Sequence, residues 1–125
     1  MKGASRRPEQ VAETLRQVLS EAFLRQEVRD PRVGYVTVTS VQVTNDLSHA
    51  TIRVTMPGEA AEKARALEGL RSAAGFLRSK VARALTTRIV PELHFELDRG
   101  LEHAARINAI LQGLRRPADG EGQEE

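Results

Sequence analysis

The residues best placed to do chemistry in this chain are basic, and they are concentrated in one segment. The stretch between Glu68 and Glu92 contains no acidic residue. It contains five basic residues, which are Arg71, Arg78, Lys80, Arg83 and Arg88. A solubilising helix surface normally mixes both signs of charge, so this segment is expected to be electropositive and to attract phosphate groups. An ordinary solvent-exposed helix face is the alternative interpretation.

A run of small residues, Ala73-Ala74-Gly75, interrupts the basic segment. Glycine inside a helix costs roughly 1 kcal/mol relative to alanine, so the run predicts a helix, a break and a second helix. If the helix continued unbroken, Arg71, Gly75 and Arg78 would share one side. The other polar residues expected on or beside that side are Ser72, Ser79, Lys80 and Arg83. A bare backbone flanked by arginines favours close approach of a nucleic-acid phosphate.

No pattern typical of catalysis or metal binding is present. His49, His94 and His103 fall in separate predicted elements, and none has a helical partner histidine or a nearby run of carboxylates. The chain has no cysteine, which excludes disulfides, zinc–thiolate sites and a cysteine nucleophile. Glycine-rich phosphate loops are absent as well. We therefore predict that the protein is not an enzyme and has no metal or other cofactor.

The charge of the chain is unevenly distributed. Its 125 residues carry a net charge of +2, yet the last seven contain four acidic residues and no basic one. Sixteen of the 19 basic residues are arginine, which binds phosphates and base edges better than lysine does. A composition bias explains part of that excess. Aromatic residues are sparse, which disfavours an RNA reader that stacks bases on a strand surface.

The apolar periodicity predicts a small α+β domain of three strands and four helices. Apolar residues at helical spacing follow Pro8 and predict a first helix. From residue 36 to 56, apolar and polar residues alternate, which predicts two antiparallel strands. A bulge is expected near Ser40, and a turn containing Asp46 is expected between the strands. Residues 59–72 and the stretch after Gly75 are predicted helices. A third strand follows Pro91, and a final helix contains four apolar residues: Ile107, Ile110, Leu111 and Leu114. We expect one sheet with helices on one face.

Three segments are expected along the chain. Residues 1–7 form a flexible basic arm, in which Arg6 and Arg7 extend the candidate binding surface, although a simple flexible tail is equally open. Residues 8–116 form the domain, and residues 117–125 form a disordered acidic tail. No signal peptide or membrane-spanning run is recognisable, so we expect a cytoplasmic protein. A monomer is expected because no spare apolar face is evident.

Four short sequence motifs occur in a specific order along nearly the whole domain. They are DPRVGYVTVT (residues 30–39), DLSHA (46–50), SAAGFLRS (72–79) and PELHF (91–95). The helix–break–helix resembles that of a KH domain, with an Ala-x-Gly kink in place of the usual Gly-x-x-Gly loop. Through these motifs together, the chain resembles ribosome-binding factor A, a bacterial family of small-subunit assembly factors, over roughly residues 6–115.

The resemblance implies a type II KH-like fold and a chaperone-like role without nuclease activity. It implies binding to the free or immature 30S subunit and its 16S rRNA in late maturation, including processing of the 16S rRNA 5′ end. It also implies a part in cold adaptation and release with the help of an assembly GTPase. The surface expected to face rRNA comprises Arg6, Arg7, Arg71, Ser72, Ala73, Ala74, Gly75, Arg78, Ser79, Lys80, Arg83 and Arg88. A general single-stranded nucleic-acid module and a protein-interaction domain remain alternatives.

Overall fold

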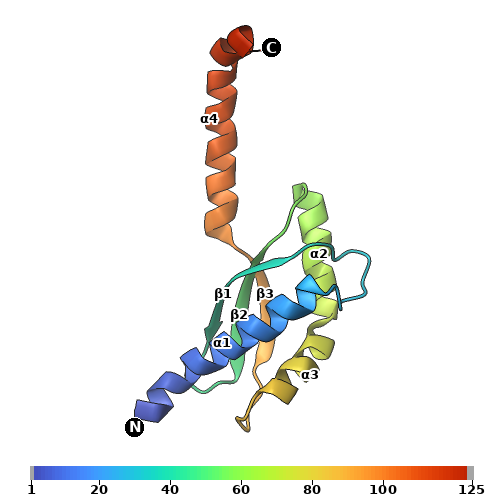
Figure 1. Ribbon diagram of the computed structural model, residues 1–125, viewed down its shortest axis with the longest axis vertical. Helices are drawn as coiled ribbons and strands as arrows, with labels where there is room; N and C mark the ends of the chain where they lie inside the picture. Colours follow the sequence, from blue (N-terminus) through green and yellow to red (C-terminus); the bar gives the residue numbers. More distant parts are fainter. Residues whose placement is uncertain (1, 124–125) are drawn as a thin grey trace.

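The seven helices and strands of the computed structural model follow the predicted order (Figure 1). The structure describes the backbone of residues 2–123 and the side chains of residues 7–114. The elements are α1 (Lys2–Leu24), β1 (Thr37–Val43), β2 (His49–Thr55), α2 (Ala60–Ser72), α3 (Ala74–Ala84), β3 (Glu92–Leu97) and α4 (Arg99–Gln123). The α+β fold class is therefore confirmed.

The three strands form one mixed sheet in the order β1-β2-β3. β1 and β2 are antiparallel neighbours, whereas β2 and β3 are parallel because α2 and α3 cross over between them. The register of β1 against β2 shifts between Val38 and Ser40, which confirms the predicted bulge. The bulge lets valines of opposite parity along β1 pack against the same core.

One face of the sheet carries the hydrophobic core, and α1, α2 and α3 cover it (Figure 1). Alternate residues of β2 and β3 point into this core, with Ile52 and Phe95 almost completely buried. The ring of Phe95 meets that of Phe23 from α1 edge-on, with 6.4 Å between the ring centroids. The intervening residues, including His49 and His94, lie on the opposite, exposed face of the sheet. In α2, Ala66 is buried in this core and Ala64 is exposed.

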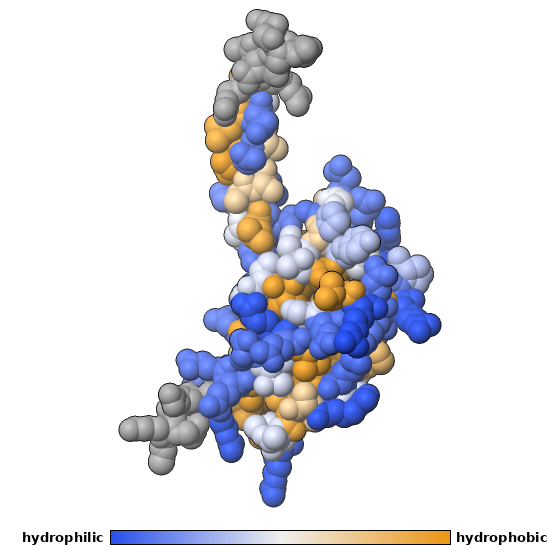
Figure 2. All heavy atoms as spheres, in the orientation of Figure 1, coloured by the Kyte–Doolittle hydropathy of each residue, from blue (hydrophilic) through white to orange (hydrophobic). Residues whose placement is uncertain are grey.

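The final helix α4 extends away from the sheet (Figure 1). It leaves exposed a series of large apolar side chains, which are Leu101, Ile107, Ile110, Leu111 and Leu114. Figure 2 shows apolar atoms along this helix. The prediction of a monomer rested on the absence of a spare apolar face, and these exposed side chains show that this premise is wrong. Helical periodicity identifies an apolar stripe, but it does not reveal whether a partner element covers the stripe. Within the described part of the chain, no helix combines the length and apolarity that membrane crossing requires.

The two ends of the chain differ from expectation in their backbone. α1 begins at Lys2 and contains Pro8 in its interior, so most of the predicted arm continues the helix. α4 runs to Gln123 and includes most of the predicted disordered tail. The side chains of residues 2–6 and 115–123, and the whole of Met1 and residues 124–125, lie outside the described part. The mobility of the arm and of the acidic tail therefore stays a prediction.

Asp46 organises the turn between β1 and β2, as its sequence context predicts. Its carboxylate accepts hydrogen bonds from the Thr44 hydroxyl at 2.8 Å and from the Ser48 hydroxyl and backbone N–H at 2.7 and 3.1 Å. Leu47 has a φ of 65° in this turn and is buried. The hydroxyl of Ser48, and next that of Thr44, lower the pKa of Asp46 to about 2.

We expect the Asp46 turn to make folding stability sensitive to acid. The carboxyl group of an unfolded aspartate has a pKa of about 3.9. Because folding lowers the pKa of Asp46, its stabilising contribution is present above about pH 4 and is lost as the pH falls towards 2. Urea denaturation of wild type and Asp46→Asn across pH 2–5 checks this. The loss of stability on acidification should be smaller in the variant, and equal losses would contradict the prediction.

Candidate nucleic-acid interface

The break between α2 and α3 occurs at Ala73, two residues before the glycine that suggested it. Ala73 has φ −88° and ψ 2°, and it ends one helix and begins the next. Its N–H donates to the carbonyls of Gly69 and Leu70, and its carbonyl accepts from the N–H of Leu77, each at 3.0 Å. No side chain caps the start of α3, and its first turn contains no acidic residue.

Gly75 lies in the first turn of α3 with open space beside it. A Cβ atom added at this position would find no other atom within 4 Å. Packing inside the protein therefore does not require glycine here. The situation differs at Gly69 in α2, where an added Cβ would lie 2.7 Å from Cγ2 of Val33. One glycine serves the fold, and the other leaves bare backbone at the surface.

Arg71 and Arg78 lie on the side of the two helices that faces β3. Arg71 donates to the carbonyl of Phe95 at 3.2 Å, and Arg78 donates to the carbonyls of Pro91 and Val90 at 3.1 and 2.8 Å. These bonds position both guanidinium groups without neutralising them. Among the described residues, no carboxylate lies within ion-pair distance of either arginine. Both arginines therefore lie against β3 or the residues just before it, although the helix is broken between them.

A shallow groove of about 290 Å³ runs along this side of α3, and we call it the basic groove. It is lined by Gly75, Arg78, Ser79, Ala82, Arg88 and Val90. None of these residues is acidic, and Arg88 is exposed in the loop that leads to β3. The groove thus combines two arginines, a hydroxyl and an open stretch of helix backbone. Such a surface suits the phosphates of a nucleic acid.

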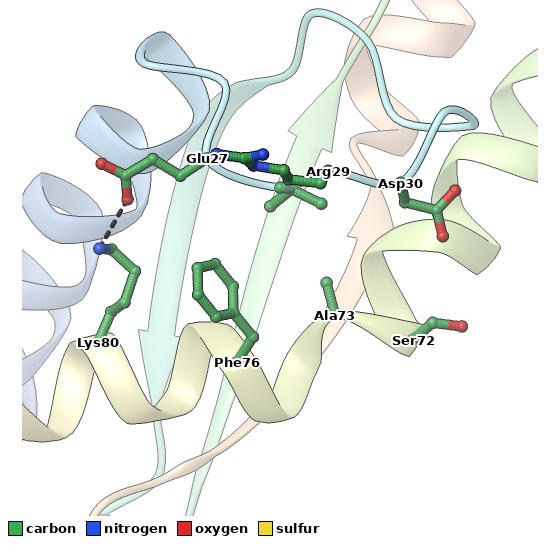
Figure 3. Close-up of a pocket in the computed structure, with 8 residues that line it drawn as sticks. Glu27, Arg29, Asp30, Ser72, Ala73, Phe76 and Lys80 are labelled. Carbon is green, nitrogen blue, oxygen red and sulfur yellow. Dashed lines mark ion pairs between the residues drawn. The ribbon is translucent and has the colours of Figure 1, made fainter.

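A second groove of about 570 Å³ lies on the other side of the helix break, and we call it the mixed groove (Figure 3). It is lined by Glu27, Val28, Arg29, Asp30, Ser72, Ala73, Phe76 and Lys80. The ammonium group of Lys80 lies 2.6 Å from a carboxylate oxygen of Glu27, and this contact lowers the pKa of Glu27. This groove contains both signs of charge, so it attracts polyanions less strongly than the basic groove does.

The remaining predicted residues do not gather in the basic groove. The hydroxyl of Ser72 accepts a hydrogen bond from Arg32 at 3.4 Å, and Ala74 is half-buried against the core. Arg83 lines a cleft between α3 and α1. Arg7 is exposed near the start of α1, which Figure 1 shows away from the α2–α3 junction. The side chain of Arg6 lies outside the described residues. The single basic face expected from the sequence is thus divided between two sides of the helices.

Sequence reasoning missed Phe76 and Arg29, both of which line the mixed groove. Phe76 is 48% exposed, its ring projects into the groove (Figure 3), and the Lys80 ammonium lies 5.7 Å from the ring centroid. One signal was available, because Phe76 falls off the apolar stripe of α3 on a helical wheel. No local signal marks Arg29, since its place depends on how the loop after α1 packs against α3.

Comparisons with known proteins agree with this fold and show the family. Residues 7–111 match the family model of ribosome-binding factor A. A relative of that name from Thermomicrobium roseum is 45% identical over 111 residues, which cover 89% of this chain and 85% of the relative. Another from Rhodopirellula baltica is 42% identical over 117 residues, covering 94% and 85% of the two chains.

Solved structures give the same result. The crystal structure of ribosome-binding factor A from Thermus thermophilus superposes with a TM-score of 0.61 and 28% identity, covering 74% of this chain and 97% of that one. A homology model of the Thermus thermophilus factor, fitted into a cryo-electron microscopy map of a complex with the 30S subunit, has a TM-score of 0.55 and 30% identity. It covers 69% of this chain and 89% of that one. This chain belongs to the ribosome-binding factor A family.

Proposed function

We propose that this protein binds the immature 30S subunit through the basic groove and thereby assists late maturation of the small subunit. The observation that carries the proposal is the groove itself, which contains two arginines and Gly75 but no acidic residue. Family membership supports the ribosomal target, and a relative from Thermus thermophilus has been fitted into a map of its 30S complex. The ligand in the groove would be 16S rRNA.

The chemistry of the groove favours contact with the rRNA backbone. Arg78 and Arg88 would bind phosphate oxygens, the hydroxyl of Ser79 would donate a further hydrogen bond, and the bare backbone at Gly75 would permit close approach. Phosphate contacts of this kind supply affinity but carry no sequence information. Specificity for the small subunit would then come from the folded shape of the rRNA. Arg71, which has no carboxylate within ion-pair distance among the described residues, would add positive charge beside this contact.

The finer parts of the proposal follow from the family. The protein would act in the cytoplasm as a non-catalytic factor, promote processing of the 16S rRNA 5′ end, and support growth in the cold. An assembly GTPase would help to release it from the finished subunit. The type II KH-like architecture, with an Ala-x-Gly kink in place of a Gly-x-x-Gly loop, fits a binder of structured RNA.

The test is sedimentation of the purified full chain with small subunits, large subunits and free 16S rRNA across a salt series. We expect selective association with the small subunit, which weakens as salt rises because counterions compete for the phosphates. Immature particles should retain more protein than mature ones. Absence of association at low salt would overturn the ribosomal assignment. Equal association with both subunits would contradict its selectivity.

A second candidate function, general binding of single-stranded nucleic acid, is favoured by one observation. Phe76 is half-exposed beside Arg29 and Lys80 in the mixed groove, where a base could stack on its ring. Tight binding of unstructured oligonucleotides that is lost in Phe76→Ala would support this function. The assembly-factor proposal expects weak oligonucleotide binding and little effect of that substitution on binding to the small subunit.

A further inference from the structure

Three side chains that could bind a metal ion meet on the exposed face of the sheet. In the parallel pairing of β2 and β3, His49 lies opposite Glu92, and Thr51 lies opposite His94. Because residues 49, 92 and 94 all point away from the core, their side chains converge on one spot. The two histidines are 45 residues apart and belong to different strands, so their sequence positions do not reveal the pair. Strand register brings them together.

The distances among the three side chains match those of metal ligands. Nδ1 of His49 lies 3.0 Å from Nε2 of His94, and Oε1 of Glu92 lies 3.5 and 3.6 Å from these two nitrogens. Ligand atoms bound to tetrahedral zinc at about 2.0–2.1 Å are separated from one another by roughly 3.3–3.4 Å. A single ion can therefore sit at normal bonding distance from all three atoms without any change in the backbone.

The backbone under these side chains is held in place by hydrogen bonds. The N–H of His49 donates to the hydroxyl of Thr44 at 3.1 Å, and its carbonyl accepts from the N–H of Thr44 at 2.9 Å. The N–H of Glu92 donates to the carbonyl of Ser48 at 2.9 Å. In the described part of the chain, no lysine or arginine lies within ion-pair distance of Glu92, and the two histidines are the side chains that approach its carboxylate. Its carboxylate is thus available to a cation.

We propose that His49, Glu92 and His94 bind a divalent transition-metal ion, of which Zn²⁺ is the best match. Two imidazoles and one carboxylate suit Zn²⁺, Co²⁺ or Ni²⁺, whereas Mg²⁺ and Ca²⁺ prefer sites made of oxygen atoms alone. Three protein ligands leave one tetrahedral position for water or for an oxygen atom of a bound partner. The site lies on the sheet face opposite the three packed helices, and none of its three ligands lines the basic groove.

The test is titration of the full chain, without a histidine tag, with ZnCl₂ in a non-chelating buffer, followed by isothermal calorimetry. We expect one Zn²⁺ per chain and at least about tenfold weaker binding in His49→Ala and His94→Ala, because each removes one of three ligands. His103→Ala is the matched control, since this exposed histidine lies on α4. Its affinity for Zn²⁺ should equal that of wild type.

Two further measurements keep the proposal falsifiable. Glu92→Gln retains the histidine pair, so weaker Zn²⁺ binding in this variant supports three-ligand coordination and wild-type affinity contradicts it. Zn²⁺ should also raise the thermal midpoint of wild type and of His103→Ala, but not that of His94→Ala. No heat of binding at millimolar Zn²⁺ would overturn the proposal. Equal binding by wild type and both histidine variants would also overturn it, because the ion would then sit elsewhere.

Discussion

Ser79→Glu/Arg88→Glu is expected to weaken binding to the small subunit by about a hundredfold or more. Both side chains are exposed in the basic groove, and Arg88 has no ion-pair partner among the described residues. The variant therefore places two carboxylates where phosphates would bind, without removing the hydrogen bonds that Arg78 makes to Pro91 and Val90. Cosedimentation at several salt concentrations measures the effect. The slope of log affinity against log salt should fall in magnitude by about one, because one phosphate contact is lost.

The matched control for this variant is Arg99→Glu/Asn108→Glu on α4. It changes the charge by the same amount at two exposed positions outside the grooves, and its binding should stay within about threefold of wild type. A second comparison is Ser72→Glu/Arg83→Glu, which carries the same charge change on the other side of the helices. If that variant lost more affinity than Ser79→Glu/Arg88→Glu, the interface would lie on the side of the mixed groove and the basic groove would be the wrong site.

Gly75→Ala is expected to stabilise the folded protein while weakening its binding to the small subunit. The added methyl group meets nothing within 4 Å, and replacing a helical glycine by alanine gains up to about 1 kcal/mol. The same methyl group would hold an rRNA backbone away from α3, at an expected cost of about tenfold in affinity. Urea denaturation and cosedimentation of the same preparation measure the two effects. A variant that binds as tightly as wild type would show that nothing approaches the backbone at this point.

Two other glycines serve as controls for Gly75→Ala. Gly113 in α4 also has open space beside it, so Gly113→Ala should gain similar stability and bind normally. Gly69→Ala should instead destabilise the folded protein, because the added Cβ would lie 2.7 Å from Cγ2 of Val33 and 3.3 Å from Cγ of Asp30. Overpacking of this kind costs about 1–3 kcal/mol. Together the three substitutions separate glycine as a packing requirement from glycine as an open surface.

Local sequence patterns were sufficient for the elements and for the centre of the candidate site. The change of apolar period from helical to alternating located the strands, and the opposite parity of the valines around Ser40 predicted the bulge in β1. The helix break and the turn at Asp46 followed from neighbouring residues alone. These features depend on steric and hydrogen-bonding preferences within a few residues, which the sequence states directly.

Features that depend on which elements lie next to one another were decided only by the tertiary structure. Arg83 was expected beside Arg71 and Arg78, but it follows Arg78 by five residues within α3, which is about 140° around the helix, and it therefore lines the cleft beside α1. The apolar stripe of α4 predicted a helix but not that its stripe would remain exposed. His49 and His94 meet because a parallel strand pair has a fixed register, and the helical crossover that sets this pairing spans the long interval between them. Long-range pairing results from the burial of the whole core, and no short segment of the chain encodes it.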